Sequence, residues 1–154
     1  MKRITTLTAI LFSFALPLAA AAQHDHATHG GAKAEQSDRV FAAYEEARQA
    51  LLKGALTDLR NAARRIGAAA HDAEQHKLMD LAGDLEDAAD LKAARAAFAT
   101  LSHEAIRYRE TRCCEKPVVA YCSMEKKSWL QPAGAIGNPY VDAAMRTCGE
   151  IKQK

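Results

Sequence analysis

The chain has 154 residues, about the length of one domain, with 21 Lys and Arg against 19 Asp and Glu. Lys2 and Arg3 are the basic residues that precede position 23, so a chain without residues 1–22 carries no net charge when its histidines are neutral. This balance argues against nucleic acid or an anionic membrane surface as the partner. Aromatic residues are scarce and alanine is abundant, which favours closely packed helices.

Residues 1–22 are typical of an export signal. A positive start, Lys2 and Arg3, precedes the apolar residues 4–18, a stretch too short to cross a bilayer comfortably. Small residues follow, and we expect cleavage near Ala22 and a periplasmic location. The alternative is a retained anchor. No later segment is apolar enough for a membrane span, so we expect no membrane insertion after cleavage.

Residues 23–36 predict a flexible, histidine-rich arm, because they contain His24, His26 and His29 beside two glycines and show no apolar period. Such a tract at a mature N-terminus can bind Cu(II), Ni(II) or Zn(II). Cleavage after Ala21 would make His24 the third residue, which suits square-planar Cu(II). The alternative is a solubilising arm without a metal.

Residues 37–112 predict four helices joined by short connections. Ser37 is the expected N-cap of the first, which ends at Gly54. The apolar spacing then predicts helices from about 56 to 70, from 74 to 88, and from 91 to 112, the last of these capped by Asp90. Short connections favour antiparallel neighbours. We therefore expect an all-α protein, an up-down four-helix bundle.

Residues 113–154 predict a small irregular segment packed on the bundle. Its expected elements are a short strand over 118–121, turns at prolines and glycines over 132–139, and a short helix over 140–148 that ends at Gly149. Most of the residues that carry unusual chemistry lie here. Functional sites tend to lie on loops that a rigid scaffold holds, so we expect the site in this segment.

Two pairs of soft sulfur ligands stand out in this segment. Cys122 and Met124 are two residues apart, so in extended backbone they point the same way. Met145 and Cys148 are three apart, and on a helix they are neighbours. Thiolates and thioethers select Cu(I) or its analogue Ag(I), and zinc rarely takes a thioether.

The alternative is a Cys122–Cys148 disulfide with Met124 and Met145 as core residues. Cys113 and Cys114 complete the four cysteines, and they can pair with the other two or serve as further soft ligands.

The remaining histidines give weaker signals. His103, on the fourth predicted helix, is either a ligand or a half-buried polar contact, whereas His71 and His76 are expected in solvent near a helix end. The chain has no glycine-rich phosphate loop, no G-x-S-x-G and no H-E-x-x-H motif. We therefore expect no enzymatic activity.

Two stretches, residues 94–102 and residues 120–150, resemble the family called domain of unknown function 3347. Together their order and spacing cover most of residues 38–151. The resemblance implies an exported helical domain near periplasmic copper handling, because that domain also occurs attached to adaptor subunits of copper and silver efflux pumps. The resemblance also implies that four residues are the metal ligands: Cys122, Met124, Met145 and Cys148. Ser123 departs from the family, which usually has proline there.

These observations together predict a periplasmic protein of copper homeostasis that holds Cu(I) or Ag(I) for sequestration or for hand-over to efflux. The rival hypothesis is an interaction module without metal, stapled by a Cys122–Cys148 disulfide, that docks on an efflux adaptor or another envelope protein. Its contact surface would be Trp129 and Leu130 with residues 138–140, because aromatic residues anchor such interfaces. These residues can instead pack the C-terminal segment over the end of the bundle.

Overall fold

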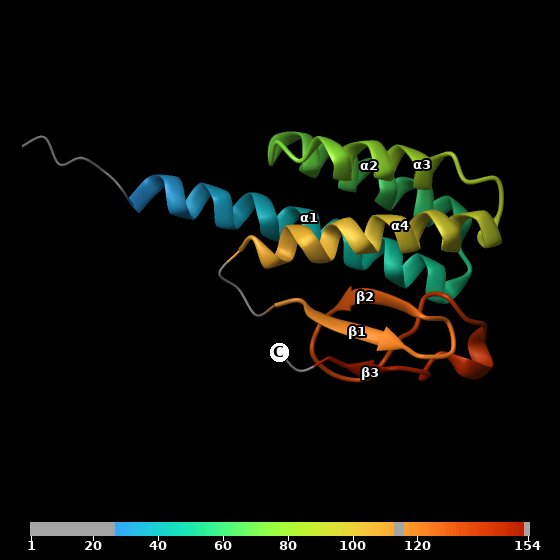
Figure 1. Cartoon of the computed structure of the whole chain (residues 1–154). Coiled ribbons are helices and arrows are strands. Elements are labelled where there is room, and N and C mark those ends of the chain that lie inside the picture. Colours follow the sequence, from blue (N-terminus) through green and yellow to red (C-terminus); the bar gives the residue numbers. More distant parts are fainter. Residues whose placement is uncertain (1–26, 113–115, 153–154) are drawn as a thin grey trace, which may run out of the picture.

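The computed structural model describes residues 27–112 and 116–152, and the side chains of residues 27–30 and 32 are not described. The described part contains four helices followed by a small antiparallel sheet. Figure 1 shows α1 (Ala27–Lys53) and α4 (Leu91–Glu110) between the sheet on one side and α2 (Leu56–Asp72) and α3 (His76–Glu86) on the other. The helical bundle is thus a scaffold with the sheet against one face.

The first helix begins at Ala27, ten residues before the predicted start at Ser37. The predicted arm over residues 23–36 is therefore wrong for the backbone from residue 27 onward. Ser37 is no cap: it is buried inside α1, and its hydroxyl donates to the carbonyl oxygen of Ala34 at 2.8 Å. A helix already nucleated in the core extends at little cost per residue through alanine, lysine and glutamate, which explains the longer helix.

The other helix boundaries follow the predictions closely. Asp90 caps α4, where its carboxylate accepts a hydrogen bond from the amide of Ala93 at 2.8 Å. The helix α3 is shorter than predicted because Glu74 has a φ of 57°, which lies outside the right-handed helical region. Gly54, with a φ of 69°, makes the turn between α1 and α2.

The core of the bundle combines small and large apolar side chains. Alanines let the helices approach one another closely, and larger side chains fill the space between them, among them Leu59, Ile66, Leu78, Leu85, Phe98 and Leu101. The ring of Tyr44 on α1 stacks on that of Phe98 on α4 at 4.8 Å between centroids. Within residues 27–112 and 116–152, no helix has both the length and the apolar character that a membrane crossing requires.

The sheet has the strand order β2-β1-β3 and is antiparallel throughout. The predicted strand is confirmed as β1 (Val118–Cys122), while β2 (Lys127–Gln131) and β3 (Glu150–Ile151) were not predicted. The predicted helix over 140–148 is wrong, because only Ala143–Met145 form a single 3₁₀ turn, η1. Pro139 and Tyr140 form a turn and Val141 a bend, and Tyr140 and Val141 are buried, so too few residues remain for a stable α-helix.

Buried aromatic residues join the sheet to the bundle. The hydroxyl groups of Tyr44 and Ser102 lie 2.5 Å apart, and the Tyr44 hydroxyl also accepts a hydrogen bond from the amide of Leu130 on β2 at 3.2 Å. Tyr140 donates to Ser102 at 3.0 Å. Trp129 and Leu130 are fully buried, and residues 138–140 are buried as well. The contact surface of the rival hypothesis is therefore wrong, because these residues are core.

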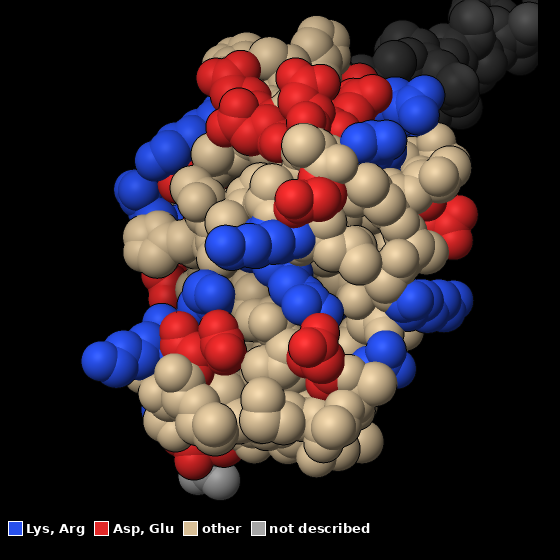
Figure 2. Space-filling model, turned by 90° about the vertical axis from the view of Figure 1, so that its right-hand side faces the viewer, with Lys and Arg blue, Asp and Glu red and all other residues tan. Residues whose placement is uncertain are grey.

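Charges of both signs are distributed over the surface that Figure 2 presents. Apart from a group of acidic side chains along its upper edge, basic and acidic residues alternate over this face. Among the described residues, surface charges of opposite sign are paired: Arg64 lies 3.1 Å from Glu86, and Arg95 lies 3.0 Å from Asp142. This face therefore presents no extended basic patch.

Candidate functional site

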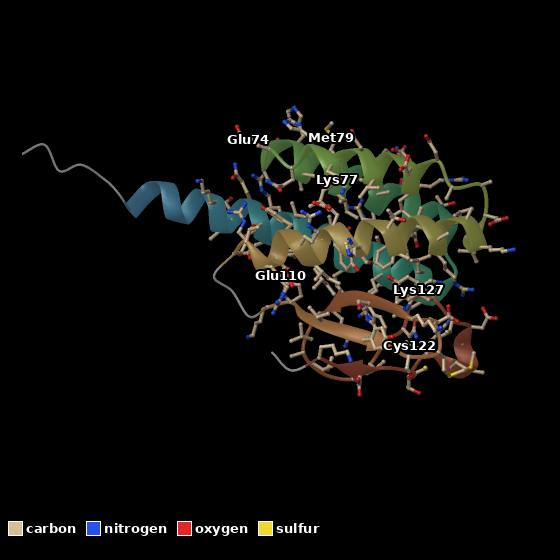
Figure 3. All side chains as sticks on the ribbon, in the orientation of Figure 1. Glu74, Lys77, Met79, Glu110, Cys122 and Lys127 are labelled. Carbon is tan, nitrogen blue, oxygen red and sulfur yellow. The ribbon has the colours of Figure 1, made fainter. Side chains whose placement is uncertain are left out.

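The structure brings the thiols of Cys122 and Cys148 together. Cys122 ends β1, and Cys148 lies between η1 and β3, 26 residues later. Their sulfur atoms lie 2.7 Å apart, and both cysteines are free. A disulfide bond is about 2.05 Å long, so the two sulfur atoms lie close to bonding distance. Figure 3 shows Cys122 at the lower right of the molecule, below the helices.

Asn138 holds the loop that carries Cys148. Its amide nitrogen donates to the carbonyl oxygen of Arg146 at 2.7 Å, and its side-chain nitrogen donates to that of Cys148 at 2.9 Å. Its side-chain oxygen accepts from the amide of Tyr140 at 2.9 Å. Asn138 is fully buried, and its three hydrogen bonds connect the loop at Arg146 and Cys148 to the chain at Tyr140.

Gly149 allows the chain to pass close to the sheet directly after Cys148. Its φ of 140° is one that side chains rarely adopt. A Cβ atom at this position would lie 2.7 Å from the Trp129 ring and 3.0 Å from the carbonyl oxygen of Tyr121. Glycine at this position therefore brings Cys148 against β1.

The two thiols have unequal acidity. Burial raises the pKa of Cys122, but the Cys148 thiol, the amides of Glu125 and Met124 and the side chain of Asn138 donate hydrogen bonds to its sulfur, and together they bring that pKa below its ordinary value. The pKa of Cys148 is raised, chiefly because its thiol donates to Cys122, with burial and the nearby Glu125 carboxylate adding to the effect. The pair therefore favours a thiolate at Cys122 and a proton on Cys148.

The methionines of the predicted ligand set lie on the surface, two and three residues from the cysteines along the chain. Met124 is 68% exposed in the turn that follows Cys122, and Met145 is 45% exposed at the end of η1. Among the described residues, these two are the large hydrophobic side chains that are exposed. The alternative that placed them in the core is therefore wrong. The amide of Cys148 donates to the carbonyl oxygen of Met145 at 2.9 Å, so both belong to one turn.

This donor set suits a soft monovalent ion better than zinc. Within residues 27–112 and 116–152, no group of three or more histidine, cysteine, aspartate or glutamate side chains is arranged to hold a metal ion. Structural zinc requires four such ligands in a tetrahedron. Cu(I) and Ag(I) accept two thiolates, and thioethers can add to them. Metal–sulfur bonds of about 2.3 Å place two thiolates about 4 Å apart, so Cys148 must move outward to admit an ion.

None of the predicted histidine ligands is found at the cysteine pair among the described residues, and two of them lie outside those residues. His103 is exposed on α4 beside Lys77 and Glu104, and it is neither half-buried nor part of the cysteine pair. His71 and His76 are exposed, as predicted. His29 lies in α1 without a described side chain. The other predicted candidates lie outside the described residues: His24, His26, Cys113 and Cys114.

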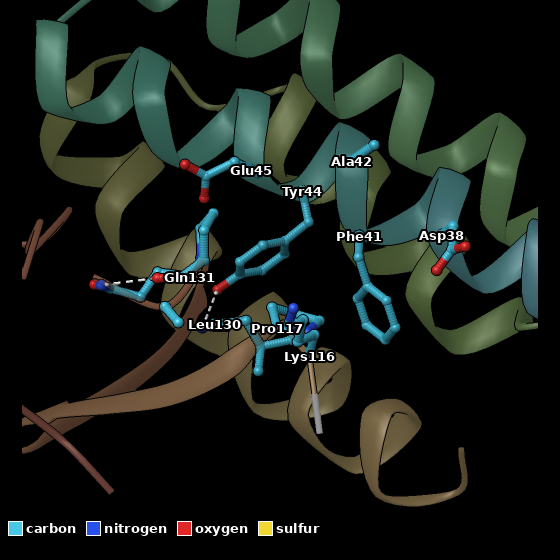
Figure 4. Close-up of a pocket in the computed structure, with 11 residues that line it drawn as sticks. Asp38, Phe41, Ala42, Tyr44, Glu45, Lys116, Pro117, Leu130 and Gln131 are labelled. Carbon is cyan, nitrogen blue, oxygen red and sulfur yellow. Dashed lines mark hydrogen bonds between the residues drawn. The ribbon is translucent and has the colours of Figure 1, made fainter. Parts of the chain in front are cut away.

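A pocket of about 480 Å³ opens between α1 and β2, with Phe41, Tyr44 and Leu130 among its lining residues (Figure 4). Two of its polar side chains are already engaged. Glu45 accepts from Arg48 at 2.7 Å, and the Gln131 side chain bonds to Trp129 at 2.9 Å. Burial raises the pKa of Tyr44 far above its ordinary value, so its hydroxyl stays protonated. The pocket is thus mainly apolar, and Asp38 and Lys116 are further charged residues in its lining.

Sequence reasoning missed the residues that shape the cysteine pair. Asn138 was assigned to a contact surface, and Gly149 was interpreted as a helix end. The glycine directly after Cys148 was the available signal, since such a residue permits a close backbone approach as readily as a helix end. The role of Asn138 depends on contacts ten residues away, which no local pattern reveals.

Comparison with known proteins gives no further information, because no family model, no curated protein and no solved structure matches this chain.

Proposed function

We propose that this protein binds Cu(I) or Ag(I) in the periplasm through Cys122 and Cys148, as a binding protein of copper homeostasis rather than an enzyme. The up-down four-helix bundle serves as its scaffold. Bound metal is sequestered or handed over to an efflux system. The histidine-rich arm captures Cu(II) and raises the local metal concentration.

The observation that carries the proposal is the close pair of free thiols, 2.7 Å apart, one of which favours the thiolate form. Soft ions bind thiolates, and a site that already stabilises a thiolate loses less affinity to competition by protons. Met124 and Met145 are exposed and belong to the two segments that carry the cysteines. They supply additional soft ligands at the entrance to the site.

A competition titration tests the proposal. Reduced protein without residues 1–22 is titrated with Cu(I) against a chromogenic chelator, beside Cys122→Ser/Cys148→Ser. We expect the protein to withdraw Cu(I) from the chelator and the variant to lose this ability. The matched control is Cys113→Ser/Cys114→Ser, which removes the same number of thiols. Equal loss in the control, or full affinity in the first variant, would contradict the proposal.

One observation favours the rival, a disulfide-stapled interaction module, because the sulfur atoms lie nearer to bonding distance than to the separation on a shared ion. Such a module needs a docking surface other than the buried Trp129, Leu130 and Tyr140. Thiol titration of protein isolated from the periplasm separates the two functions. Free thiols at Cys122 and Cys148 favour metal binding, and a persistent bridge favours the module.

A further inference from the structure

The two neighbouring sulfurs differ in their access to solvent. The Cys122 side chain is fully buried at the end of β1, while Cys148 is half-buried in the loop between η1 and β3. A reagent in solution therefore reaches Cys148 first. Since the sulfur atoms lie 2.7 Å apart, any group bound to the Cys148 sulfur is held directly beside that of Cys122.

We propose that Cys148 is a site of thiol–disulfide exchange with small disulfides, and that Cys122 resolves the adduct into a reversible Cys122–Cys148 disulfide. The accessible cysteine meets the reagent, and the buried one completes the reaction. That this reaction also switches off metal binding rests on the proposed function. The exchange itself does not.

The reaction has two steps. First, Cys148 gives up its proton, and the resulting thiolate attacks one sulfur of a small disulfide, whose S–S bond breaks and releases one small thiolate. Second, the Cys122 thiolate attacks the Cys148 sulfur of the mixed disulfide and releases the second small thiolate. Two protein thiols are oxidised, the small disulfide is reduced to two thiols, and the two protons from the protein pass to the leaving groups.

Metal binding and disulfide formation require opposite movements of the same loop. A shared soft ion separates the two sulfurs to about 4 Å, whereas a disulfide draws them to about 2.05 Å. A disulfide also leaves no thiolate to bind the ion, so the oxidised site cannot hold Cu(I).

Exchange is tested without metal, in a Cys113→Ser/Cys114→Ser background that keeps only the described pair. The reduced protein is mixed with oxidised glutathione, and its intact mass is followed. We expect the loss of two hydrogens without a lasting glutathione adduct. With Cys122→Ser added, a stable adduct should form at Cys148. With Cys148→Ser added, the folded protein should stay unmodified and react only after denaturation.

Three results would overturn the exchange. In the first, the Cys113→Ser/Cys114→Ser protein stays fully reduced in oxidised glutathione. In the second, it keeps a lasting glutathione adduct. In the third, the folded Cys148→Ser variant reacts as fast as Cys122→Ser. A Cu(I) titration of the oxidised form then tests the coupling to metal. Binding that is lost on oxidation and returns with a reductant supports it, and unchanged binding in the disulfide form overturns it. Because mass alone reports the exchange, its failure is distinguishable from failure of the proposed function.

Discussion

The buried asparagine Asn138 connects the folding of the C-terminal segment to the chemistry of its thiols. It uses its backbone amide and both atoms of its side-chain amide to hold Arg146, Cys148 and Tyr140. It also helps to lower the pKa of the Cys122 thiol. One residue therefore fixes the position of the half-buried Cys148 and stabilises the charged form of the buried Cys122.

The unequal acidity of the two thiols predicts how the stability of the metal-free, reduced protein depends on pH. Cys122 has a lowered pKa in the folded state, so its contribution is present above the ordinary thiol pKa and is lost as the pH falls through the lowered value. Cys148 has a raised pKa, so its contribution is present below the ordinary thiol pKa and is lost as the pH rises through the raised value.

The contribution of the pair to the unfolding free energy should therefore reach a maximum near the ordinary thiol pKa. Urea unfolding over a pH series measures this contribution as the difference in unfolding free energy between the protein and the Cys122→Ser/Cys148→Ser variant. A difference that does not vary with pH would contradict the assigned directions of the two pKa shifts.

Two glycines with nearly equal backbone angles isolate the close approach beside Cys148. Gly149→Ala should destabilise the protein by about 1–3 kcal/mol more than Gly134→Ala, because the added Cβ meets Trp129 and Tyr121. Gly134 has a φ of 138°, against 140° for Gly149, and nothing lies within 4 Å of its Cβ position. Both variants place an alanine at nearly the same positive φ, so the difference between their unfolding free energies in urea reports the steric clash. Equal losses would show that the approach to Trp129 does not constrain the chain.

Among the secondary-structure elements, sequence periodicity predicted the helices far better than the strands. Helices α2 and α4 each have an apolar face set by local spacing, and Asp90 marked the start of α4. The strand β2 buries Trp129, Leu130 and Gln131 in succession, so it lacks the alternation of a strand with one exposed face. The strand β3 has two residues and exists through its pairing with β1. Neither feature is visible in a local pattern.

Because local sequence patterns do not reveal long-range packing, only part of the site was predicted. The interaction between Cys122 and Cys148 was expected, as shared ligands or as a bridge, and the structure places them side by side. The helical pairing of Met145 with Cys148 was wrong because η1 has only three residues. The exposure of both methionines depends on how the turns pack, and spacing alone does not reveal it.

The contact between the bundle and the sheet depends on the hydroxyl of Tyr44. Tyr44→Phe should lower the unfolding free energy by about 1–3 kcal/mol, because the buried amide of Leu130 and the Ser102 hydroxyl each lose a partner. Tyr121→Phe is the matched control, since its hydroxyl has no hydrogen bond to any of the described residues. Denaturant unfolding compares the two. A loss in the control as large as that in Tyr44→Phe would contradict this role.

Within the described residues, the start of α1 and the cysteine pair are widely separated. The first turns of α1 project beyond the rest of the fold at the left of Figure 1, while Cys122 lies at the lower right in Figure 3. The described side chains over residues 31–35 are exposed. The beginning of α1 therefore adds little to the core and does not contribute to the cysteine pair.

Removal of residues 23–35 from the protein without residues 1–22 should therefore leave Cu(I) affinity unchanged. It should change the unfolding free energy by less than about 0.5 kcal/mol, because exposed helix ends contribute little to stability. Cu(II) binding by the histidine arm should be lost. Competition titrations with each ion and urea unfolding check these outcomes. A marked fall in Cu(I) affinity would show that the arm contributes ligands to the cysteine site.

X-ray absorption at the copper edge, recorded on the Cu(I)-loaded protein, tests the central claim most directly. The account predicts a first shell of sulfur scatterers alone, and it predicts that Cys122→Ser/Cys148→Ser loses this shell. A first shell dominated by nitrogen or oxygen, or a sulfur shell that survives in the variant, would contradict a Cu(I) site at the cysteine pair.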